Sequence, residues 1–172
     1  MALNKNKHKN TFLSFQIGKE IFAVSVKKVL EVLQNQHITE IPDVPDFVKG
    51  VINFRGDILP VIDTRIKFKI PIVDKEKYVV IVLELTNDDK TMRICAIVDS
   101  VKDVIAVDEA DVKPVPELGL KYKGDFLSGM VKTGDSFTMI LDVNRVFTFD
   151  EIEILSETKA ISETKPEQKM IN

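Results

Sequence analysis

The sequence is poor in the side chains that most often carry metal or nucleophilic chemistry. Its 172 residues include one cysteine, two histidines and no tryptophan. Cys95 has no second cysteine for an intramolecular disulfide, and its position in the apolar run MRICAIV predicts a buried structural thiol. With only His8 and His37 beside it, the chain lacks the nitrogen and sulfur ligands of a zinc site, so we expect no metal and no cofactor.

Long apolar runs and a strong excess of one charge are also missing. The first ten residues, MALNKNKHKN, are polar and basic with no apolar region behind them, which predicts a flexible segment over 1–10 and no secretory signal. No segment is apolar over a length that could cross a bilayer. A net charge of -3 gives no general attraction to nucleic acid or anionic lipid. We therefore expect a cytoplasmic protein, without direct membrane insertion, whose partners are other proteins.

Motifs of catalysis and of phosphate binding are missing as well. Nothing around His37 resembles the turn that presents a catalytic nucleophile. The segment GVINFRGD has two glycines but lacks the Lys-Ser or Lys-Thr pair of a phosphate-binding loop. A basic strip of Arg65, Lys67 and Lys69 alternates with apolar residues, yet it lacks the aromatic side chains on which single-stranded nucleic acid stacks. The sequence thus predicts neither an enzyme nor a nucleic-acid-binding protein.

The sequence does contain a dense series of strand signals between residues 11 and 147. In TFLSFQIGKEIFAV, alternate apolar residues form one strand face, and Gly18 and Lys19 provide a tight reversal, which predicts a β-hairpin. The run YVVIVLEL is apolar on both faces near its middle and predicts an interior strand. In SVKKVLEVL the period becomes helical, which predicts one short helix capped by Ser25. The apolar residues of that helix are Val26, Val29, Leu30 and Leu33.

An internal repeat is the most informative feature of the sequence. Residues 22–63 and 95–142 show the same order of signals, and FVKGVINFRGDILPVID in the first segment aligns with FLSGMVKTGDSFTMILD in the second. The four residues from Val26 to Val29 align with those from Val101 to Val104. Two similar all-β units, each with too few strands to cover a flat sheet, predict two small barrels packed together. We expect the chain to cross from one barrel to the other near 67–78.

The segment PDFVKGVINFRGDILPVIDTR, residues 45–65, resembles the signature of the CheW family, in which a KGVxNxRGxxxPVxDxR pattern joins two strands of the first barrel. The resemblance continues through IVDSVKDVIAV, VKPVPEL and FLSGMVKTGDSFTMILDVNRVF. It implies an all-β fold over residues 11–149, with two SH3-like five-stranded barrels around a shared core and short helices. For residues 150–172 we expect a short helix and a polar tail.

Members of the CheW family are chemotaxis adaptors that couple transmembrane chemoreceptors to the histidine kinase CheA. The resemblance implies the same function for this chain, at receptor arrays near the inner face of the membrane. The adaptor would act by scaffolding and not by catalysis. Two alternatives stay open at this point: an adaptor of a non-flagellar signalling array, and a small β-barrel that binds a ligand or nucleic acid.

Two sets of candidate binding residues follow from the resemblance. Family members receive the tip of a chemoreceptor helical hairpin in a groove between the barrels, and the matching positions here are Val29, Glu31, Val32, Gly50, Asn53 and Arg55. Positions in the VKPVPEL segment correspond to a contact with the regulatory domain of the kinase, and the candidates are Lys113, Glu117 and Leu118.

Several of these residues also have a physical interpretation of their own. Gly50 permits a backbone conformation or close approach that a Cβ would block, and Asn53 can fix a turn through its side chain. Arg55 projects a planar guanidinium, which can bind a receptor or form an internal ion pair with a residue such as Asp63. Both interpretations stay open from the sequence. For Val29, burial in the core is the favoured alternative to receptor contact.

Overall fold

A computed structural model describes residues 9–34, 36–116 and 126–147 of the chain. Its strands are β1 (Lys9–Ile17), β2 (Glu20–Ser25), β3 (Val29–Gln34), β4 (Val48–Phe54), β5 (Asp57–Asp63), β6 (Val79–Asn87), β7 (Lys90–Val98), β8 (Ser100–Asp108), β9 (Leu127–Thr133) and β10 (Ser136–Leu141). The short helices are η1 (Val26–Lys28), α1 (Thr64–Lys67), η2 (Glu109–Asp111) and α2 (Val143–Val146). The predicted N-terminal segment and C-terminal tail lie almost wholly outside the described residues.

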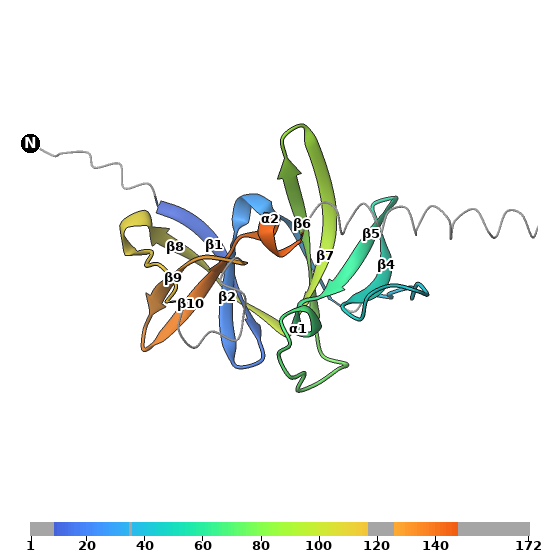
Figure 1. Ribbon diagram of the computed structural model, residues 1–172, viewed down its shortest axis with the longest axis horizontal. Helices are drawn as coiled ribbons and strands as arrows, with labels where there is room; N and C mark the ends of the chain where they lie inside the picture. Colours follow the sequence, from blue (N-terminus) through green and yellow to red (C-terminus); the bar gives the residue numbers. More distant parts are fainter. Residues whose placement is uncertain (1–8, 35, 117–125, 148–172) are drawn as a thin grey trace, which may run out of the picture.

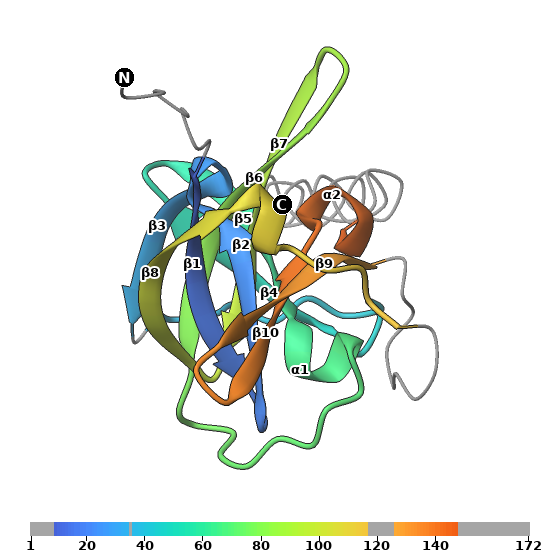
Figure 2. The same ribbon diagram turned by 90° about the vertical axis from the view of Figure 1, so that its left-hand side faces the viewer.

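The strands form two five-stranded sheets, each curled into a small barrel (Figure 1). One sheet has the strand order β8-β1-β2-β10-β9 and is called the β1 barrel; Figure 2 looks onto it. The other has the order β3-β6-β7-β5-β4 and is called the β6 barrel. The predicted fold class is therefore confirmed: the chain is all-β, with two five-stranded barrels and short helices.

The internal repeat is confirmed, and the structure reveals that its two halves exchange strands. β1 to β5 with α1 correspond to β6 to β10 with α2. When each strand is replaced by its counterpart in the other half, the strand order of one sheet becomes that of the other. Each barrel takes a hairpin from one half, β1–β2 or β6–β7, and its three other strands from the other half. Neither half can therefore complete a barrel by itself.

The prediction that the chain crosses between barrels near 67–78 is wrong. That segment leads from α1 to β6 and thus connects β5 and β6, which belong to the same barrel. The chain instead changes barrel at η1, between β2 and β3, and at Asp99, between β7 and β8. The reason lies in the pairs β2–β10 and β5–β7, which are parallel. The two strands of a parallel pair need a long connection. Each hairpin, β1–β2 or β6–β7, therefore joins strands of the other half of the chain, and the chain changes barrel where a hairpin ends.

The helix predicted over SVKKVLEVL is confirmed only in its first turn. Ser25 caps η1, since its Oγ accepts a hydrogen bond from the N–H of Lys27 at 3.3 Å. From Val29 onward the chain forms β3, which pairs antiparallel with β6. The edge of β6 offers main-chain hydrogen bonds over the whole of this segment, and β-branched residues such as Val29 and Val32 suit a strand. Tertiary pairing thus overrides the helical spacing of the apolar residues.

One apolar core lies between the barrels, and a smaller core lies inside each. Phe22 of β2 and Ile94 of β7 belong to the shared core, whereas Ala23 and Cys95 point into the β1 and β6 barrels respectively. The central strands are therefore apolar on both faces, and the predicted interior position of YVVIVLEL is confirmed by β6, which lies between β3 and β7. Burial of the Cys95 thiol is also confirmed, and it raises the pKa of this group to about 12.

A buried ion pair stabilises the start of α1. Asp63 caps this helix, and its two carboxylate oxygens accept hydrogen bonds from Nε and Nη2 of Arg65, each at 3.0 Å. Arg65 is only 2% exposed. Burial alone would lower the pKa of Arg65, but the hydrogen bonds and charges of Asp63 and Asp99 raise it above its ordinary value. The predicted basic strip with Lys67 and Lys69 is wrong, because Arg65 is not at the surface.

The repeat yields a prediction at Gly50 and Gly129, which occupy equivalent positions. A Cβ on Gly50, whose φ is +144°, would overlap the backbone oxygen of Thr39, whereas a Cβ on Gly129 would lie 2.5 Å from a side-chain methyl of Val112 and 3.1 Å from the backbone oxygen of Lys113. We expect Gly50→Ala to lower the free energy of unfolding by about 3 kcal/mol or more, the upper end of overpacking costs. Gly129→Ala should cost less, because a side chain can rotate away. Urea unfolding compares the two; equal losses would contradict this account.

The buried ion pair yields a second prediction. Arg65→Met should lower the free energy of unfolding by about 3–5 kcal/mol, because it leaves the carboxylate of Asp63 buried without a partner. Adding Asp63→Asn removes that charge and should recover part of the loss. Arg93→Met is the control, since the pairs of Arg93 with Asp57 and Glu84 are exposed and should be worth about 1 kcal/mol or less. Denaturant unfolding of the variants measures these values, and a double variant no more stable than Arg65→Met would refute the explanation.

Candidate functional site

The residues matched to receptor binding all lie on the β6 barrel. Val29, Glu31 and Val32 are in β3, Gly50 and Asn53 are in β4, and Arg55 is in the turn between β4 and β5. β3 and β4 are the two outer strands of this sheet, and the place where they approach each other is called the seam of the barrel. The curling of the sheet therefore gathers residues that are distant in the sequence.

An ion pair between Arg55 and Glu31 bridges this seam. Nη2 of Arg55 lies 2.8 Å from Oε2 of Glu31, and the guanidinium carbon lies 4.9 Å from the centre of the Phe54 ring. The Arg55 side chain is 73% exposed. Pairing of Arg55 with Asp63, left open by the sequence, is wrong, because Asp63 is buried and binds Arg65. An ion pair this exposed adds little stability, so its charges are available to a partner.

The backbone beneath this ion pair is held by Asn53 and Gly50. Oδ1 of Asn53 accepts a hydrogen bond from the N–H of Gly56 at 3.0 Å, which confirms that Asn53 fixes the turn. The turn places Arg55 at a φ of +52°, a conformation that Asn53 helps to maintain. Gly50 is buried and lies against Thr39. These two residues therefore shape the site, while Glu31 and Arg55 provide its charges.

A β-bulge divides the residues of β3 between its two faces. Val29 pairs with Leu83 and Val32 with Ile81, and both partners belong to the shared core. Since side chains of paired residues lie on the same face, Val29 and Val32 face the space between the barrels. Val29 is half-buried against the shared core, while Val32 is exposed at its rim. The burial favoured for Val29 is thus confirmed in part.

Val104 of β8 is an exposed apolar residue that sequence reasoning missed. Its side chain is 64% exposed, and it pairs with Leu13 of the shared core, so it also lies on the face toward the space between the barrels. The sequence alignment of the repeat places Val104 beside Val29, and the register of the sheets makes it equivalent to Val32, since Val104 pairs with Leu13 and Val32 with Ile81. That alignment was the signal that could have identified it.

The candidate kinase-binding residues are only partly described. Lys113 is exposed, and its main chain forms two hydrogen bonds with Met130 of β9, at 2.8 and 2.9 Å. Glu117 and Leu118 lie outside the described residues. Lys113 borders a groove of about 560 Å³ on the β1 barrel, whose apolar residues include Val131 and Phe137. Phe137 is 53% exposed, which makes it a candidate that the sequence did not single out.

This groove occupies the seam of the β1 barrel, between β8 and β9. The register of the sheets makes Ile105 equivalent to Leu33, since Ile105 pairs with Phe12 of β1 and Leu33 pairs with Val80, the equivalent residue of β6. Ile105 lines the groove. The seam thus carries an ion pair in the β6 barrel and an apolar groove in the β1 barrel.

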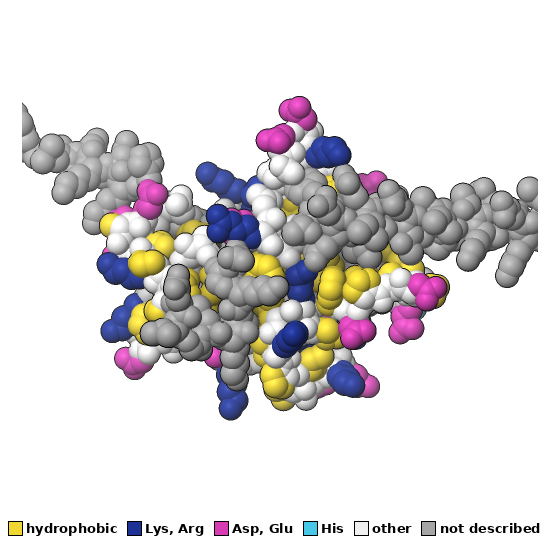
Figure 3. Space-filling view, viewed as in Figure 1, with side chains coloured by type: hydrophobic (Ala, Val, Ile, Leu, Met, Phe, Trp, Pro, Cys, Tyr) yellow, Lys and Arg dark blue, Asp and Glu magenta, His cyan; other side chains and the backbone are white. Residues whose placement is uncertain are grey.

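Other kinds of site receive no support from the described residues. Within residues 9–34, 36–116 and 126–147, no group of three or more His, Cys, Asp or Glu side chains is placed to hold a metal ion. Among the helices of the same residues, none is long and apolar enough to span a membrane. On the face in Figure 3, basic and acidic side chains are interspersed, which is not the basic surface of a nucleic-acid-binding protein.

Comparisons with known proteins agree with this geometry. The family model of the CheW-like domain matches residues 11–151. The chemotaxis protein CheW of Klebsiella aerogenes is 30% identical over 144 residues, which are 84% of this chain and 85% of that protein. The chemotaxis protein CheW of Treponema pallidum is 27% identical over 159 residues, 91% of each chain. The crystal structure of the scaffolding protein TtCheW from Thermoanaerobacter tengcongensis has a TM-score of 0.73 and 30% identity, and it covers 83% of this chain and 95% of that one. The chain therefore belongs to the CheW family of chemotaxis adaptor and scaffold proteins.

Proposed function

We propose that this protein couples transmembrane chemoreceptors to the histidine kinase CheA by binding both at once. The observation that carries the proposal is that the two candidate surfaces lie on different barrels and differ in chemistry. The β6 barrel offers the Glu31–Arg55 ion pair, and the β1 barrel offers an apolar groove beside Lys113. One chain can therefore hold two unlike partners. The protein acts in the cytoplasm, at receptor arrays near the inner face of the membrane, and is not an enzyme.

The receptor surface fits the tip of a helical hairpin. A helix binds through apolar side chains that enter a groove, and a few charges fix its orientation. Val29 and Val32 provide apolar contacts toward the space between the barrels, Glu31 and Arg55 provide the charges, and Asn53 with Gly50 holds the backbone of the site. The exposed Val104 extends the apolar surface from the other barrel.

The kinase surface fits another small β-barrel. The groove in the seam of the β1 barrel accepts an apolar anchor, and Lys113 at its border pairs with an acidic residue of the partner. Glu117 and Leu118, matched through the family resemblance, follow Lys113 in the sequence and belong to the same proposed surface. The adaptor then works as a scaffold, because a shift of the bound receptor biases the conformational equilibrium of the bound kinase.

The coupling itself can be tested by reconstitution. Receptor in membrane vesicles, kinase and this protein are combined, and autophosphorylation of the kinase is measured with and without receptor ligand. We expect ligand to change kinase activity only when this protein is present. A response of kinase activity to receptor ligand that is the same with and without this protein would rule out the proposed function.

The receptor surface leads to a prediction at Arg55. Arg55→Glu reverses an exposed charge, so it should weaken receptor binding about tenfold, equal to 1.4 kcal/mol, while the melting temperature stays nearly unchanged. The swapped variant Arg55→Glu/Glu31→Arg restores the intramolecular ion pair but presents the charges in reversed positions. It should bind receptor as poorly as Arg55→Glu. Isothermal titration with receptor-tip fragments measures binding; recovery in the swapped variant would mean that the ion pair serves only the fold.

The kinase surface leads to a prediction at Phe137 and Lys113. Phe137→Ala removes the proposed apolar contact and should weaken binding of the kinase regulatory domain about tenfold, since burying a Phe side chain is worth about 1.5–3 kcal/mol. Lys113→Glu should mainly slow association, and the effect should shrink at high salt. Val73→Ala is the control, because Val73 is exposed elsewhere, in the loop before β6. Surface plasmon resonance distinguishes these effects. Equal affinity of Phe137→Ala and Val73→Ala would exclude the groove as the docking site.

A further inference from the structure

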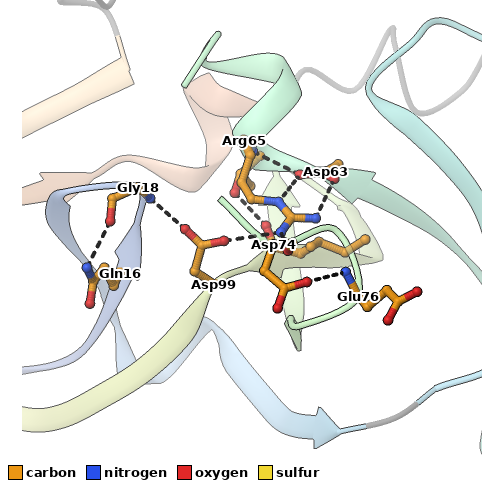
Figure 4. A network of polar contacts seen from close by, with 9 residues as sticks. Gln16, Gly18, Asp63, Arg65, Asp74, Glu76 and Asp99 are labelled. Atoms are coloured by element: carbon orange, nitrogen blue, oxygen red, sulfur yellow. Dashed lines mark hydrogen bonds and ion pairs between the residues drawn. The ribbon is translucent and has the colours of Figure 1, made fainter. Parts of the chain in front are cut away.

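Asp99 lies where the chain passes from the β6 barrel to the β1 barrel, between β7 and β8. Its carboxylate bridges two donors, as Figure 4 shows. Oδ1 accepts a hydrogen bond from Nη1 of Arg65 at 3.1 Å, and Oδ2 accepts one from the backbone N–H of Gly18 at 2.6 Å. The backbone N–H of Asp99 also donates to the carbonyl oxygen of Gln16 at 2.9 Å.

The two donors belong to different barrels. Arg65 is in α1, which follows β5 of the β6 barrel, and Asp63 holds its guanidinium in place. Gly18 is in the turn of the β1–β2 hairpin, where the Nε2 of Gln16 donates to its carbonyl oxygen at 2.8 Å. The carboxylate of Asp99 therefore connects a rigid point of one barrel to a rigid point of the other.

An apolar contact occurs at the same place. A Cβ on Gly18 would lie 2.5 Å from Cγ2 of Ile70, a residue of the loop that follows α1. The φ of Gly18 is +62°, so the turn requires glycine for its conformation as well as for this close approach. The β1–β2 turn thus packs directly on the β6 barrel. Packing in the shared core is not directional, whereas hydrogen bonds are, so the bridge at Asp99 can fix the angle between the barrels.

This arrangement does not follow the repeat. When the caps Asp63 and Asp142 are aligned, the residue equivalent to Arg65 is Asn144. Oδ2 of Asp142 instead lies 3.4 Å from Nε of the exposed Arg145. The β6–β7 turn, equivalent to the turn at Gly18, projects beyond the barrels in Figure 1. Among the described residues, the bridge therefore occurs on one side of the repeat, as a specific connection and not as a by-product of the fold.

We propose that Asp99 is a positioning residue that fixes the angle between the two barrels, so that a shift of the partner on one barrel is transmitted to the partner on the other. The proposal rests on the proposed function for its effect on signalling. Its structural part, the fixed angle, stands independently. Two discrete arrangements of the barrels become accessible when the bridge is broken, because packed interfaces adapt by rearrangement more readily than by continuous deformation.

Asp99→Asn is the informative substitution. The amide has nearly the size of the carboxylate, but it has one acceptor oxygen where the carboxylate has two. It can accept from Gly18 or from Arg65 but not from both, since its NH₂ group would face the other donor. Ile70→Ala is a second variant, which loosens the apolar part of the same contact. Asp57→Asn is the matched control, because the exposed pair of Asp57 with Arg93 lies within the β6 barrel.

The angle is measured by the distance between two spin labels in the otherwise intact protein. Labels are attached to cysteines that replace the exposed Lys49 of the β6 barrel and Lys132 of the β1 barrel. The native Cys95 is fully buried and does not compete for the label. We expect the distance distribution to broaden or shift in Asp99→Asn and in Ile70→Ala and to stay unchanged in Asp57→Asn. A distribution that is the same in all variants would overturn the fixed angle.

Transmission is measured with the reconstituted receptor and kinase. Asp99→Asn should bind each partner with unchanged affinity, yet the effect of receptor ligand on kinase activity should fall about fivefold or more, the scale of a lost coupling free energy. A mere loss of folded protein would lower both binding affinities together. An altered angle with undiminished control of the kinase would overturn transmission through Asp99. Failure of the wild-type protein to bind receptor or kinase would instead reject the proposed function, while the spin-label result would still decide whether Asp99 fixes the angle.

Discussion

Each barrel of this protein depends on strands from both halves of the chain, a hairpin from one half and three strands from the other. The parallel pairs β2–β10 and β5–β7 lie at the centre of this exchange, and each joins strands from different halves of the repeat. Because these strands are covered on both sides, they are apolar on both faces, with Phe22 beside Ala23 and Ile94 beside Cys95. The barrels and the core between them must therefore form together.

The exchange keeps the two halves alike in backbone but leaves their surfaces free to differ. The seam of one barrel carries the Glu31–Arg55 ion pair, and the seam of the other is an apolar groove with Ile105. Arg65 is part of a buried bridge, whereas the equivalent Asn144 is not. A duplicated fold can thus offer two unlike surfaces, and among the described residues the bridge at Asp99 connects the two barrels on one side of the repeat.

Much of the fold was predictable where local chemistry decides it. The turn at Gly18 requires a positive φ, Ser25 caps a helical turn, and Asn53 closes its own turn with the N–H of Gly56. The repeat and the segment from Pro45 to Arg65 led to the family and hence to two barrels. The family resemblance was enough to name the candidate receptor residues, but the ion-pair partner of Arg55 was not predictable, since it is Glu31 of β3 and not Asp63.

The sequence by itself determined the turns, the caps, the apolar strands and the duplication, because each depends on residues close together in the chain or on a pattern repeated along it. Only the tertiary structure decided that Val29–Gln34 is a strand, because the edge of β6 provides its hydrogen bonds. The same holds for the crossing points and for the bridge at Asp99, which joins Gly18 to Arg65. These features depend on groups that are distant in the sequence, and local propensity carries no information about which distant groups will meet.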